Sequence, residues 1–298
     1  MTECTHPGLY VHVPFCKTKC PYCDFYSVTS LSSIPEWLEA LRREMLLYKD
    51  RFSGFDSLYL GGGTPSLLPG RALADLLHRL RTSFLFAGDT EFTVEVNPDD
   101  VTSDTLTVLR DLGVNRISLG VQSFDDRDLQ FLKRRHTADQ AVKAIDEFKG
   151  AGFAKVGLDL MYGLPEQTET SWVKTLERAV SFNLEHLSCY QLTIHENTPF
   201  GSLQAKGDIK PASDENQSRF FILTSALLEE RGYLHYEVSN FAKGEGNFCR
   251  HNLKYWQRAD YLGLGPSAHS FQDGARWWNL QDLEGYCRAL AQDKPPLA

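Results

Sequence analysis

Strand-like runs and helix-like segments alternate along most of this chain, and this alternation constrains the fold more than any other feature. Short runs typical of β-strands are predicted at residues 9–13, 55–60, 91–96, 114–120, 154–160 and 185–192. Apolar residues at helical spacing form one stripe between the first two runs: Trp37, Leu41, Met45, Tyr48 and Phe52. Further helical segments are predicted at residues 70–84, 103–111, 137–150 and 169–182.

Repeated strand–helix units build a parallel sheet with helices packed against it. Glycines suited to helix C-termini, Gly113 and Gly152, end two of the predicted helices. The six predicted units are fewer than the eight of a closed barrel. The sequence therefore predicts an α/β fold, an open and partial (β/α)6 barrel of the TIM-like type.

The length and charge of the chain narrow its functional classes. Its 298 residues suffice for one barrel-sized domain with a small appendage, and 42% of them are hydrophobic, which is normal for a soluble globular protein. A net charge of −8, from 31 basic and 39 acidic residues, argues against a nucleic-acid-binding surface. No apolar run is long enough to span a bilayer, and the first residues lack the features of a signal peptide. We expect a cytoplasmic location, where thiols stay reduced.

A polar loop at residues 194–211 separates two parts of the chain. We expect a partial-barrel core at residues 1–210 and a short α+β extension at residues 211–298, in which Ser213 can cap a helix. The extension is dense in aromatic residues and histidine, notably in "CRHNLKYW" and "YLGLGPSAHSF". Because it ends in the linker-like "DKPPLA", a further C-terminal domain is expected to be missing or cut short.

Three cysteines, Cys16, Cys20 and Cys23, stand in a C-x3-C-x2-C pattern after the first predicted strand. Thiolates select zinc, copper(I) or iron–sulfur clusters. Zinc would need a fourth ligand, for which His12 or Asp24 is available, and a redox-active cysteine pair is a further interpretation. An iron–sulfur cluster normally takes four cysteines, so three would leave one iron open to an exogenous ligand.

Polar residues end several of the predicted strands. Glu95, Gln122 and Asp159 each close an apolar run, and ligands bind at the carboxyl ends of parallel strands. Because a buried, unpaired carboxylate or amide is costly, three at equivalent positions predict one shared pocket. Three glycines at residues 61–63 follow the second strand, where they allow backbone amides to approach a ligand closely. An ordinary core hydrogen bond or a simple turn is the alternative at each position.

The cysteine pattern, in a loop after the first strand of such a sheet, resembles the radical S-adenosylmethionine (radical SAM) superfamily. Within it, "LYVHVPFC", "LGGGTPS", "EVNPDD", "GVQSF" and "DLMYGLP" resemble, in order, the oxygen-independent coproporphyrinogen oxidase-like branch. The resemblance implies a 4Fe–4S cluster on the three cysteines, with S-adenosylmethionine on the open iron and cleaved to a 5′-deoxyadenosyl radical. It places the following residues around S-adenosylmethionine: Tyr10, Tyr22, Gly62, Gly63, Thr64, Glu95, Gln122, Arg134, Asp159 and Thr193.

Two kinds of protein in this branch fit the chain: coproporphyrinogen III oxidases, which decarboxylate propionate side chains, and haem chaperones of the HemW type. The oxidases usually have a fourth cysteine two residues after the third, where this chain has Phe25. The run "HNLKYW" at residues 251–256 matches the H-N-x-x-Y-W signature of the HemW group. The resemblance therefore implies a haem chaperone on a radical SAM scaffold, without coproporphyrinogen oxidase activity. An active radical enzyme and a zinc-stabilised interaction protein are the alternatives.

The signature also suggests how haem is held. On a helix, His251 and Tyr255 share a face, with Trp256 beside it. Neutral imidazole is the commonest axial ligand of haem iron, and flanking aromatic rings can cover the macrocycle. We therefore predict His251 as the haem ligand, with Cys249 and His269 as rivals and a core histidine in an aromatic cluster as the structural alternative. The implied partners are haem and recipient haemoproteins, while a transient contact with membrane-bound haemoproteins and a homodimer are left open.

Overall fold

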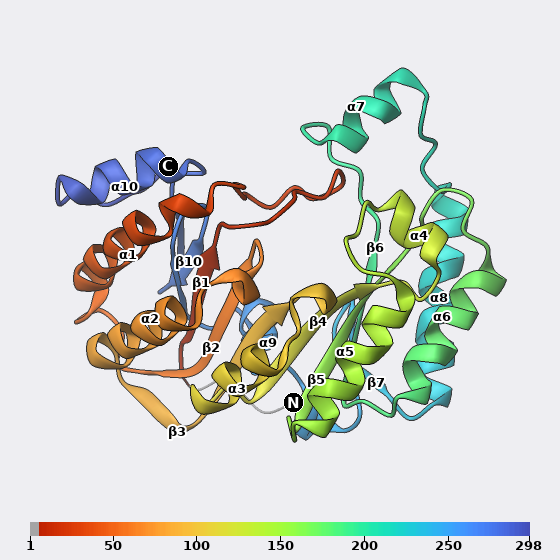
Figure 1. The fold of residues 1–298 in the computed structure, drawn as a ribbon, viewed down its shortest axis with the longest axis horizontal. Coiled ribbons are helices and arrows are strands. Elements are labelled where there is room, and N and C mark those ends of the chain that lie inside the picture. The colour runs from red at the N-terminus through yellow and green to blue at the C-terminus, as the bar shows by residue number, and fades with distance from the viewer. Residues whose placement is uncertain (1–5) are drawn as a thin grey trace.

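The computed structural model describes residues 6–298, in which eleven strands form one open sheet (Figure 1). Its centre consists of six parallel strands in chain order: β1 (Gly8–Val13), β2 (Phe55–Gly62), β3 (Phe86–Val96), β4 (Arg116–Gln122), β5 (Lys155–Tyr162) and β6 (His186–Gln191). The predicted partial (β/α)6 barrel is confirmed. β3 begins earlier than predicted because Phe86 pairs with Phe55 ahead of the main register of the two strands.

Helices connect the parallel strands, and most of them cover the outer face of the sheet (Figure 1). In chain order they are α1 (Ile34–Tyr48), α2 (Gly70–Ser83), α3 (Ser103–Asp111), α4 (Asp126–Phe131), α5 (Ala138–Gly150) and α6 (Glu169–Ser181). Thr137 and Thr168 begin α5 and α6 with capping boxes. Gly113 and Gly152 follow α3 and α5 with φ angles of 81° and 80°, the left-handed conformation that commonly ends a helix. Single 3-10 turns occur at Leu31–Ser33, Pro65–Leu67, Pro98–Asp100 and Glu245–Asn247.

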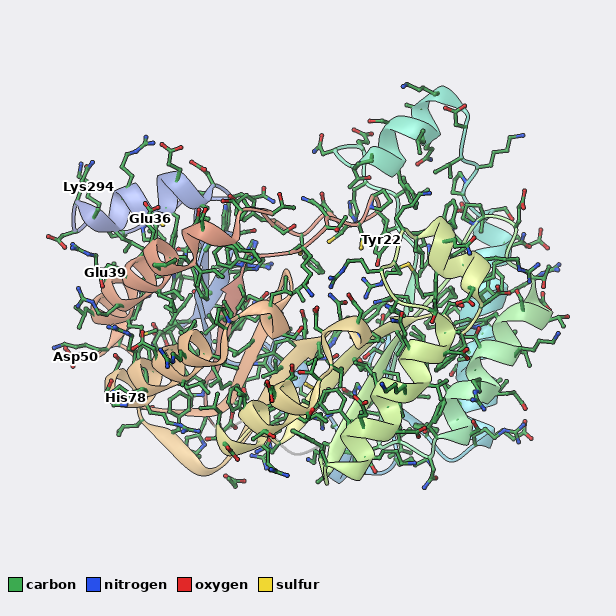
Figure 2. All side chains as sticks on the ribbon, in the orientation of Figure 1. Tyr22, Glu36, Glu39, Asp50, His78 and Lys294 are labelled. Carbon is green, nitrogen blue, oxygen red and sulfur yellow. The ribbon has the colours of Figure 1, made fainter. Side chains whose placement is uncertain are left out.

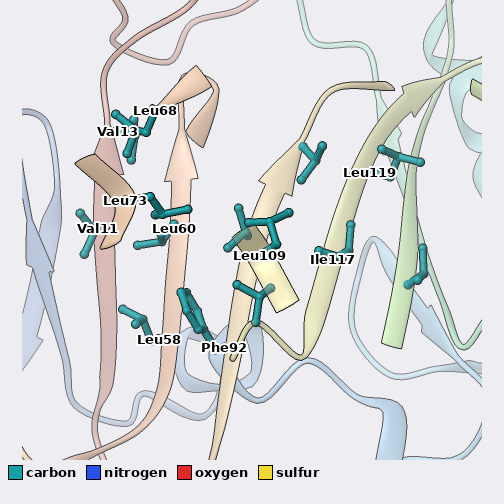
Figure 3. Close-up of a cluster of buried hydrophobic side chains, with 14 of the residues drawn as sticks. Val11, Val13, Leu58, Leu60, Leu68, Leu73, Phe92, Leu109, Ile117 and Leu119 are labelled. Atoms are coloured by element: carbon teal, nitrogen blue, oxygen red, sulfur yellow. The ribbon is translucent and has the colours of Figure 1, made fainter. Parts of the chain in front are cut away.

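Alternate residues of the central strands face opposite sides of the sheet. The outward set packs beneath the helices and forms the main core, part of which Figure 3 shows: Val11, Val13, Leu58, Leu60, Phe92, Ile117 and Leu119 of the strands with Leu73 of α2 and Leu109 of α3. The inward set is different in kind, because it includes Tyr10, Tyr59, Glu95 and Asp159. The outer face therefore supplies packing energy, and the inner face is left for a site.

The residues after β6 widen the same sheet at both edges. Two short antiparallel strands, β8 (Asn240–Ala242) and β7 (Leu234–His235), are added beyond β6. At the opposite edge, β9 (Tyr261–Leu264) runs parallel to β1, and the antiparallel β10 (His269–Gln272) and β11 (Ala275–Trp278) follow it. The α+β extension is thus part of the sheet that carries the core.

Four more helices belong to this later part: α7 (Pro199–Lys206), α8 (Asp214–Glu230), α9 (Arg250–Gln257) and α10 (Leu283–Ala291). The Ser213 hydroxyl caps α8 as predicted. α9 lies against the inner face, since a side chain at Gly8 would meet His251 and Lys254 of α9. α10 packs beside α1 (Figure 1). Among residues 6–298, no helix has the length and apolar character needed to cross a membrane.

Glu44 of α1 connects the core to the end of the chain. Its side chain is fully buried, and its carboxylate accepts hydrogen bonds from the Gly265 amide (2.8 Å), Asn279 Nδ2 (2.6 Å) and the Tyr286 hydroxyl (2.5 Å). Burial raises the pKa of this carboxyl to about 7, although the three donors favour the charged form. α1 and α10 therefore meet around a carboxyl group that titrates near neutral pH.

We expect the contribution of Glu44 to the free energy of unfolding to fall as the pH rises from about 4.5 to about 7, because folded Glu44 keeps its proton where the unfolded side chain has lost it. One such group contributes about 1.4 kcal/mol for each pH unit in this window. Glu44→Gln cannot ionise, so its free energy of unfolding should change more favourably with rising pH than that of the wild type across this window. Denaturant unfolding at several pH values between 4.5 and 7 measures the difference.

The matched control is Glu39→Gln, on the exposed side of the same helix. Hydrogen bonding to Arg42 lowers the pKa of Glu39 to about 2, outside the tested window. This variant should keep the slope of the wild type. Equal slopes in the wild type and Glu44→Gln would mean that Glu44 is not a source of the pH dependence.

Candidate functional site

A small cavity, with about 80 Å³ of space for water-sized molecules, opens at the carboxyl ends of β1 to β4. Its lining comes from the loop after β1 (Cys16, Thr18, Lys19, Cys20, Tyr22, Cys23 and Ser27), the turn after β2 (Gly62, Gly63 and Thr64), the turn after β3 (Asn97 and Asp99) and the segment after α4 (Lys133, Arg134 and Arg135). Figure 2 shows Tyr22 in the first of these segments, on the side of the molecule that carries α4. The segments meet because the carboxyl ends of neighbouring parallel strands lie at one edge of the sheet.

The predicted metal ligands Cys16, Cys20 and Cys23 are free, partly exposed thiols in this cavity. Burial raises the pKa of the Cys23 thiol to about 11, and negative charge on Cys20 and Cys16 raises it further. Two donors face the sulfurs: Thr64 Oγ1 lies 3.6 Å from Cys16 Sγ, and Arg134 Nη1 lies 3.6 Å from Cys20 Sγ. Three thiolates this close would repel one another, so an electropositive group is needed to hold all three deprotonated.

The described side chains do not favour a mononuclear site. Among residues 6–298, no group of three or more His, Cys, Asp or Glu side chains is arranged to hold one metal ion. His12, a candidate fourth zinc ligand, is buried with Nε2 bonded to the Tyr26 carbonyl at 2.8 Å, and burial lowers its pKa to about 4. The other candidate, Asp24, lies 3.8 Å from His195. Sulfurs spread around a cavity suit a cluster whose irons each take one thiolate.

Arg134 points its guanidinium into the cavity from the segment after α4. Nη2 donates to Asn97 Oδ1 (2.5 Å) and to the Gly120 carbonyl (2.8 Å), while Nη1 reaches the Tyr22 hydroxyl at 3.5 Å. The neighbouring Arg135 is paired instead with Asp99 at 2.8 Å and with Asp100 at 3.3 Å. The structure therefore gives Arg134 and Arg135, which are adjacent in the sequence, different partners.

The glycines after β2 have a packing role that the sequence did not predict. The amide of Gly62 donates to Glu95 Oε2 (3.1 Å), that of Gly63 to the Val13 carbonyl (2.8 Å), and that of Thr64 to the Phe15 carbonyl (2.7 Å). Gly62 has φ +104°, and a Cβ there would lie 2.5 Å from the His12 ring. These amides donate within the protein, and glycine is required here for close backbone packing. Gly62, Gly63 and Thr64 also line the cavity, so their contact with S-adenosylmethionine stays a prediction.

Glu95 and Asp159 lie on the inner face beside the cavity and influence each other electrostatically. Glu95 accepts hydrogen bonds from the Tyr59 hydroxyl (3.0 Å) and the Gly62 amide. Burial raises its pKa to about 7, and the charge of Asp159 raises it further. Asp159 accepts the Ser118 hydroxyl at 2.8 Å, and burial raises its pKa to about 6. Among residues 6–298, no lysine or arginine forms an ion pair with either carboxylate, an arrangement suited to holding polar groups of a ligand.

Gln122 ends β4 in a strained conformation. Its φ of +67° is in the left-handed region, and the β4–β5 register shifts between Leu119 and Gln122. Its side-chain amide lies close to Gly120, where Arg134 and Asn97 also meet. Strain of this kind at a non-glycine residue is typical of functional sites.

The remaining residues predicted to surround S-adenosylmethionine are not all at the cavity. Tyr22 lines it, and its ring packs on Phe200. Tyr10 lies deeper on the inner face, where its hydroxyl is 3.2 Å from His12 Nδ1 and its ring lies against Tyr59. Thr193 is exposed in the segment after β6 and is not among the residues that line the cavity.

His251, the predicted haem ligand, lies inside the protein with 1% of its surface exposed. Its Nδ1 is 3.2 Å from Ser57 Oγ, and its Nε2 is 2.7 Å from the Tyr255 hydroxyl. Burial lowers its pKa to about 3, and the charge of Lys254 lowers it further. The imidazole is thus neutral, but both ring nitrogens are already hydrogen bonded in this conformation.

The two alternative haem ligands, Cys249 and His269, differ in how much of each side chain is exposed at the surface. Cys249 is buried, donates to Glu91 Oε1 at 3.5 Å, and has a pKa raised to about 12 by burial. His269 is exposed on β10, with its ring beside that of Trp278. Tyr255 and Trp256 of the "HNLKYW" run are 42% and 55% exposed, so aromatic surface of the motif is available to a ligand.

Sequence reasoning missed two polar residues that shape the site. Asn97 lines the cavity and accepts from Arg134, and Asp100 is bonded by Lys17 of the cysteine loop at 2.7 Å. Both belong to "EVNPDD", quoted above only for the resemblance. The available signal was their position directly after a strand, where Asn97 follows the buried Val96.

The comparisons with known proteins agree with this geometry. The family model described as the Radical SAM superfamily matches residues 10–179. The haem chaperone HemW of Mycobacterium tuberculosis is 37% identical over 297 residues, which cover 98% of this chain and 76% of that relative. This chain belongs to the HemW family within the radical SAM superfamily. The HemW proteins of Escherichia coli (40% identical, covering 90% of this chain and 71% of the relative) and Bacillus subtilis (35%, covering 95% and 76%) are similar too.

Solved structures place this HemW-family chain on the same scaffold as an oxidase. Coproporphyrinogen III oxidase (HemN) from Escherichia coli, titled a radical SAM enzyme, superimposes with a TM-score of 0.84 at 27% identity, covering 98% of this chain and 71% of that one. Streptococcus suis SuiB bound to S-adenosylmethionine has a TM-score of 0.53 at 17% identity, covering 76% and 49%, and shares the fold alone.

Replacing Gly62 by alanine should disturb the link between the glycine turn and the cysteine loop. The new Cβ would lie 2.5 Å from the His12 ring in a left-handed backbone conformation. We expect Gly62→Ala to lower the free energy of unfolding by at least about 2 kcal/mol, from strain and overpacking together. Denaturant titration at fixed pH measures the loss.

Gly88→Ala, in the exposed first part of β3, is the matched control, because a Cβ there meets no atom within 4 Å. It should leave the unfolding midpoint within about 0.5 kcal/mol of the wild type. Equal stability of the two variants would contradict the packing role given to Gly62.

Proposed function

We propose that this chain is a haem chaperone, which binds a 4Fe–4S cluster, S-adenosylmethionine and haem and delivers haem to haemoproteins. The observation that carries this proposal is the cavity with three thiols in a chain at least 35% identical to the curated HemW proteins compared above. In it, Cys16, Cys20 and Cys23 would hold the cluster. The cluster would leave one iron for S-adenosylmethionine and would supply, when bound, an electron for cleavage of its sulfonium.

The donor set of the cavity fits such a group. Arg134 and Thr64 point donors at two of the sulfurs, which stabilises thiolate over thiol. Lys133 and Arg134 would add positive charge for the carboxylate of S-adenosylmethionine, while Glu95 and Asp159 would face its amino group or ribose. The roles of Tyr10, Tyr22, Gln122 and Thr193 around S-adenosylmethionine are part of the same proposal, with Thr193 the most remote from the cavity.

Haem transfer is favoured over porphyrinogen oxidation by two features of the chain. Phe25 stands where the oxidases usually carry a fourth cysteine, and its side chain is 67% exposed. The "HNLKYW" run exposes Tyr255 and Trp256, which offer flat aromatic surface to a macrocycle. The likeness to HemN favours neither function, because it shows a shared scaffold. One candidate haem ligand, His251, would first have to leave Ser57 and Tyr255 before its ring could reach iron.

Anaerobic reconstitution tests the cluster. The wild type should take up iron and sulfide in the amounts of one 4Fe–4S cluster, and added S-adenosylmethionine should shift its electron paramagnetic resonance (EPR) signal, because one iron is open. Cys20→Ala should abolish uptake, since one of three thiolate anchors is lost. Cys287→Ala, which removes a buried thiol of α10, is the matched control and should behave as the wild type. Purified material that holds zinc, or a cluster signal unmoved by S-adenosylmethionine, would count against the proposal.

Haem binding and porphyrinogen turnover separate the two candidate functions. Reconstituted wild type should give a saturable Soret shift on titration with ferric haem, because it carries exposed aromatic surface and accessible histidine. The same preparation should not decarboxylate coproporphyrinogen III when S-adenosylmethionine and a reductant are supplied. Stoichiometric porphyrinogen oxidation without haem binding would replace the chaperone proposal by the oxidase.

A further inference from the structure

The inner face of the sheet continues past β1 onto β9, β10 and β11, and there it carries an aromatic surface with one accessible histidine. Strand alternation sets its members: Phe271 pairs with Tyr261 of β9 and with Arg276 of β11, and His269 pairs with Trp278. The rings of Tyr261 and Phe271 lie 6.2 Å apart, and Tyr261 meets Tyr255 of α9 at 4.7 Å. Because α9 lies on the inner face, these contacts show that His269 and Trp278 are on that face as well.

Gly263 allows the backbones of β9 and β10 to approach each other closely beneath this surface. It pairs with Tyr10 of β1, and the antiparallel register of β10 brings it beside His269. A Cβ at Gly263 would lie 2.1 Å from the His269 carbonyl oxygen, so this position admits no side chain. The row across the sheet therefore runs from Trp278 and His269 over the buried backbone of Gly263 to the half-buried Tyr10. Because the backbone of His269 fills the space over Gly263, the exposed members of this row are His269 and Trp278.

His269 is the accessible imidazole of this row. Its side chain is exposed, its ring centroid lies 5.6 Å from that of Trp278, and neither ring nitrogen is hydrogen bonded to a residue within 6–298. Burial, together with the charge of Arg276, lowers the pKa of His269, so the ring is neutral at pH 7, the form that binds iron. His251, by contrast, would first have to break two hydrogen bonds and leave the interior.

Charge on this surface suits the polar edge of a porphyrin. Arg276 is exposed on the inner face of β11, next to Phe271 in the register. Its guanidinium also influences Tyr261. A haem whose iron meets an imidazole here would place its apolar ring over aromatic side chains and its propionates within reach of an arginine.

We propose that His269 is the axial ligand of the haem iron, with Trp278 against the macrocycle and Arg276 pairing with a propionate. This inference rests on the proposed haem-binding function and adds to it the residue and the strands that hold the haem. It assigns the "HNLKYW" run a different part: His251 positions Tyr255 through their 2.7 Å hydrogen bond, and Tyr255 supports the aromatic surface through Tyr261.

The test is ferric haem titration of the reconstituted full chain, followed by absorption and EPR spectra, for His269→Ala, His251→Ala, Arg276→Gln and the control His78→Ala. His78 is exposed on α2, on the outer side of the molecule (Figure 2). His269→Ala should weaken haem binding about tenfold or more and lose the spectral signature of an axial histidine. Added imidazole should restore that signature. His251→Ala and Arg276→Gln should keep it, even where affinity falls, and His78→Ala should match the wild type.

Outcomes that overturn the inference are distinct from those that overturn the function. If His269→Ala keeps the axial-histidine signature while His251→Ala loses it, haem binding stands and His251 is the ligand. If both variants keep the signature, the ligand lies elsewhere and His269 is excluded. If the wild type binds no haem, the proposed function and this inference fail together. Because His269 is exposed, thermal unfolding of His269→Ala should stay close to that of the wild type, which separates loss of a ligand from loss of the fold.

Discussion

Backbone pairing that continues past the ends of β1 and β2 holds the cysteine loop in place, and the site depends on it. The amides of Gly63 and Thr64 donate to the carbonyls of Val13 and Phe15, so the glycine turn and the first part of the cysteine loop run side by side. Only glycine fits at Gly62 and Gly63, where a Cβ would collide with the His12 ring or with the carbonyls of Val13 and Phe15. The thiols are thereby presented to a cavity before any cofactor arrives, which limits the ordering cost of binding.

The charged side chains of the same region form two groups, one near the opening of the cavity and one deeper on the inner face. Near the opening of the cavity, Asp100 forms ion pairs with Lys17 of the cysteine loop and with Arg135 of the segment after α4. Asp100 therefore links the segments that follow β1, β3 and α4. Deeper, Glu95 and Asp159 share the inner face without contacting a cation, and both have raised pKa values. Arg134 lies between these two groups of charges. Its guanidinium donates to Asn97 Oδ1, to the Gly120 carbonyl and to Cys20 Sγ. Cationic groups thus face the thiols, and carboxyl groups face the interior, as a zwitterionic ligand would require.

The inner face brings together strands that lie far apart in the chain. Tyr10 of β1 lies between the polar residues of β2 to β5 and the buried backbone of Gly263 on β9. The rings of Tyr59 and His251 both pack against that of Tyr10. The helix α9, which carries "HNLKYW", therefore contacts the inner face next to the polar residues of the central strands.

The sequence by itself determined the strand–helix alternation, the helix caps at Thr137 and Thr168, and the cysteine spacing, because each depends on residues close together in the chain. It also predicted that Glu95 and Asp159 face one pocket, since equivalent strand ends lie at one edge of a parallel sheet. The structure places both on the inner face, outside the set of residues that line the cavity. Only the tertiary structure decided which histidine is buried. Pairing of β9 with β1 places α9 under the inner face and encloses His251, whereas β10 at the widened edge leaves His269 exposed. Burial is set by contacts between residues some 250 positions apart, such as Lys254 with His6, and no local pattern records them.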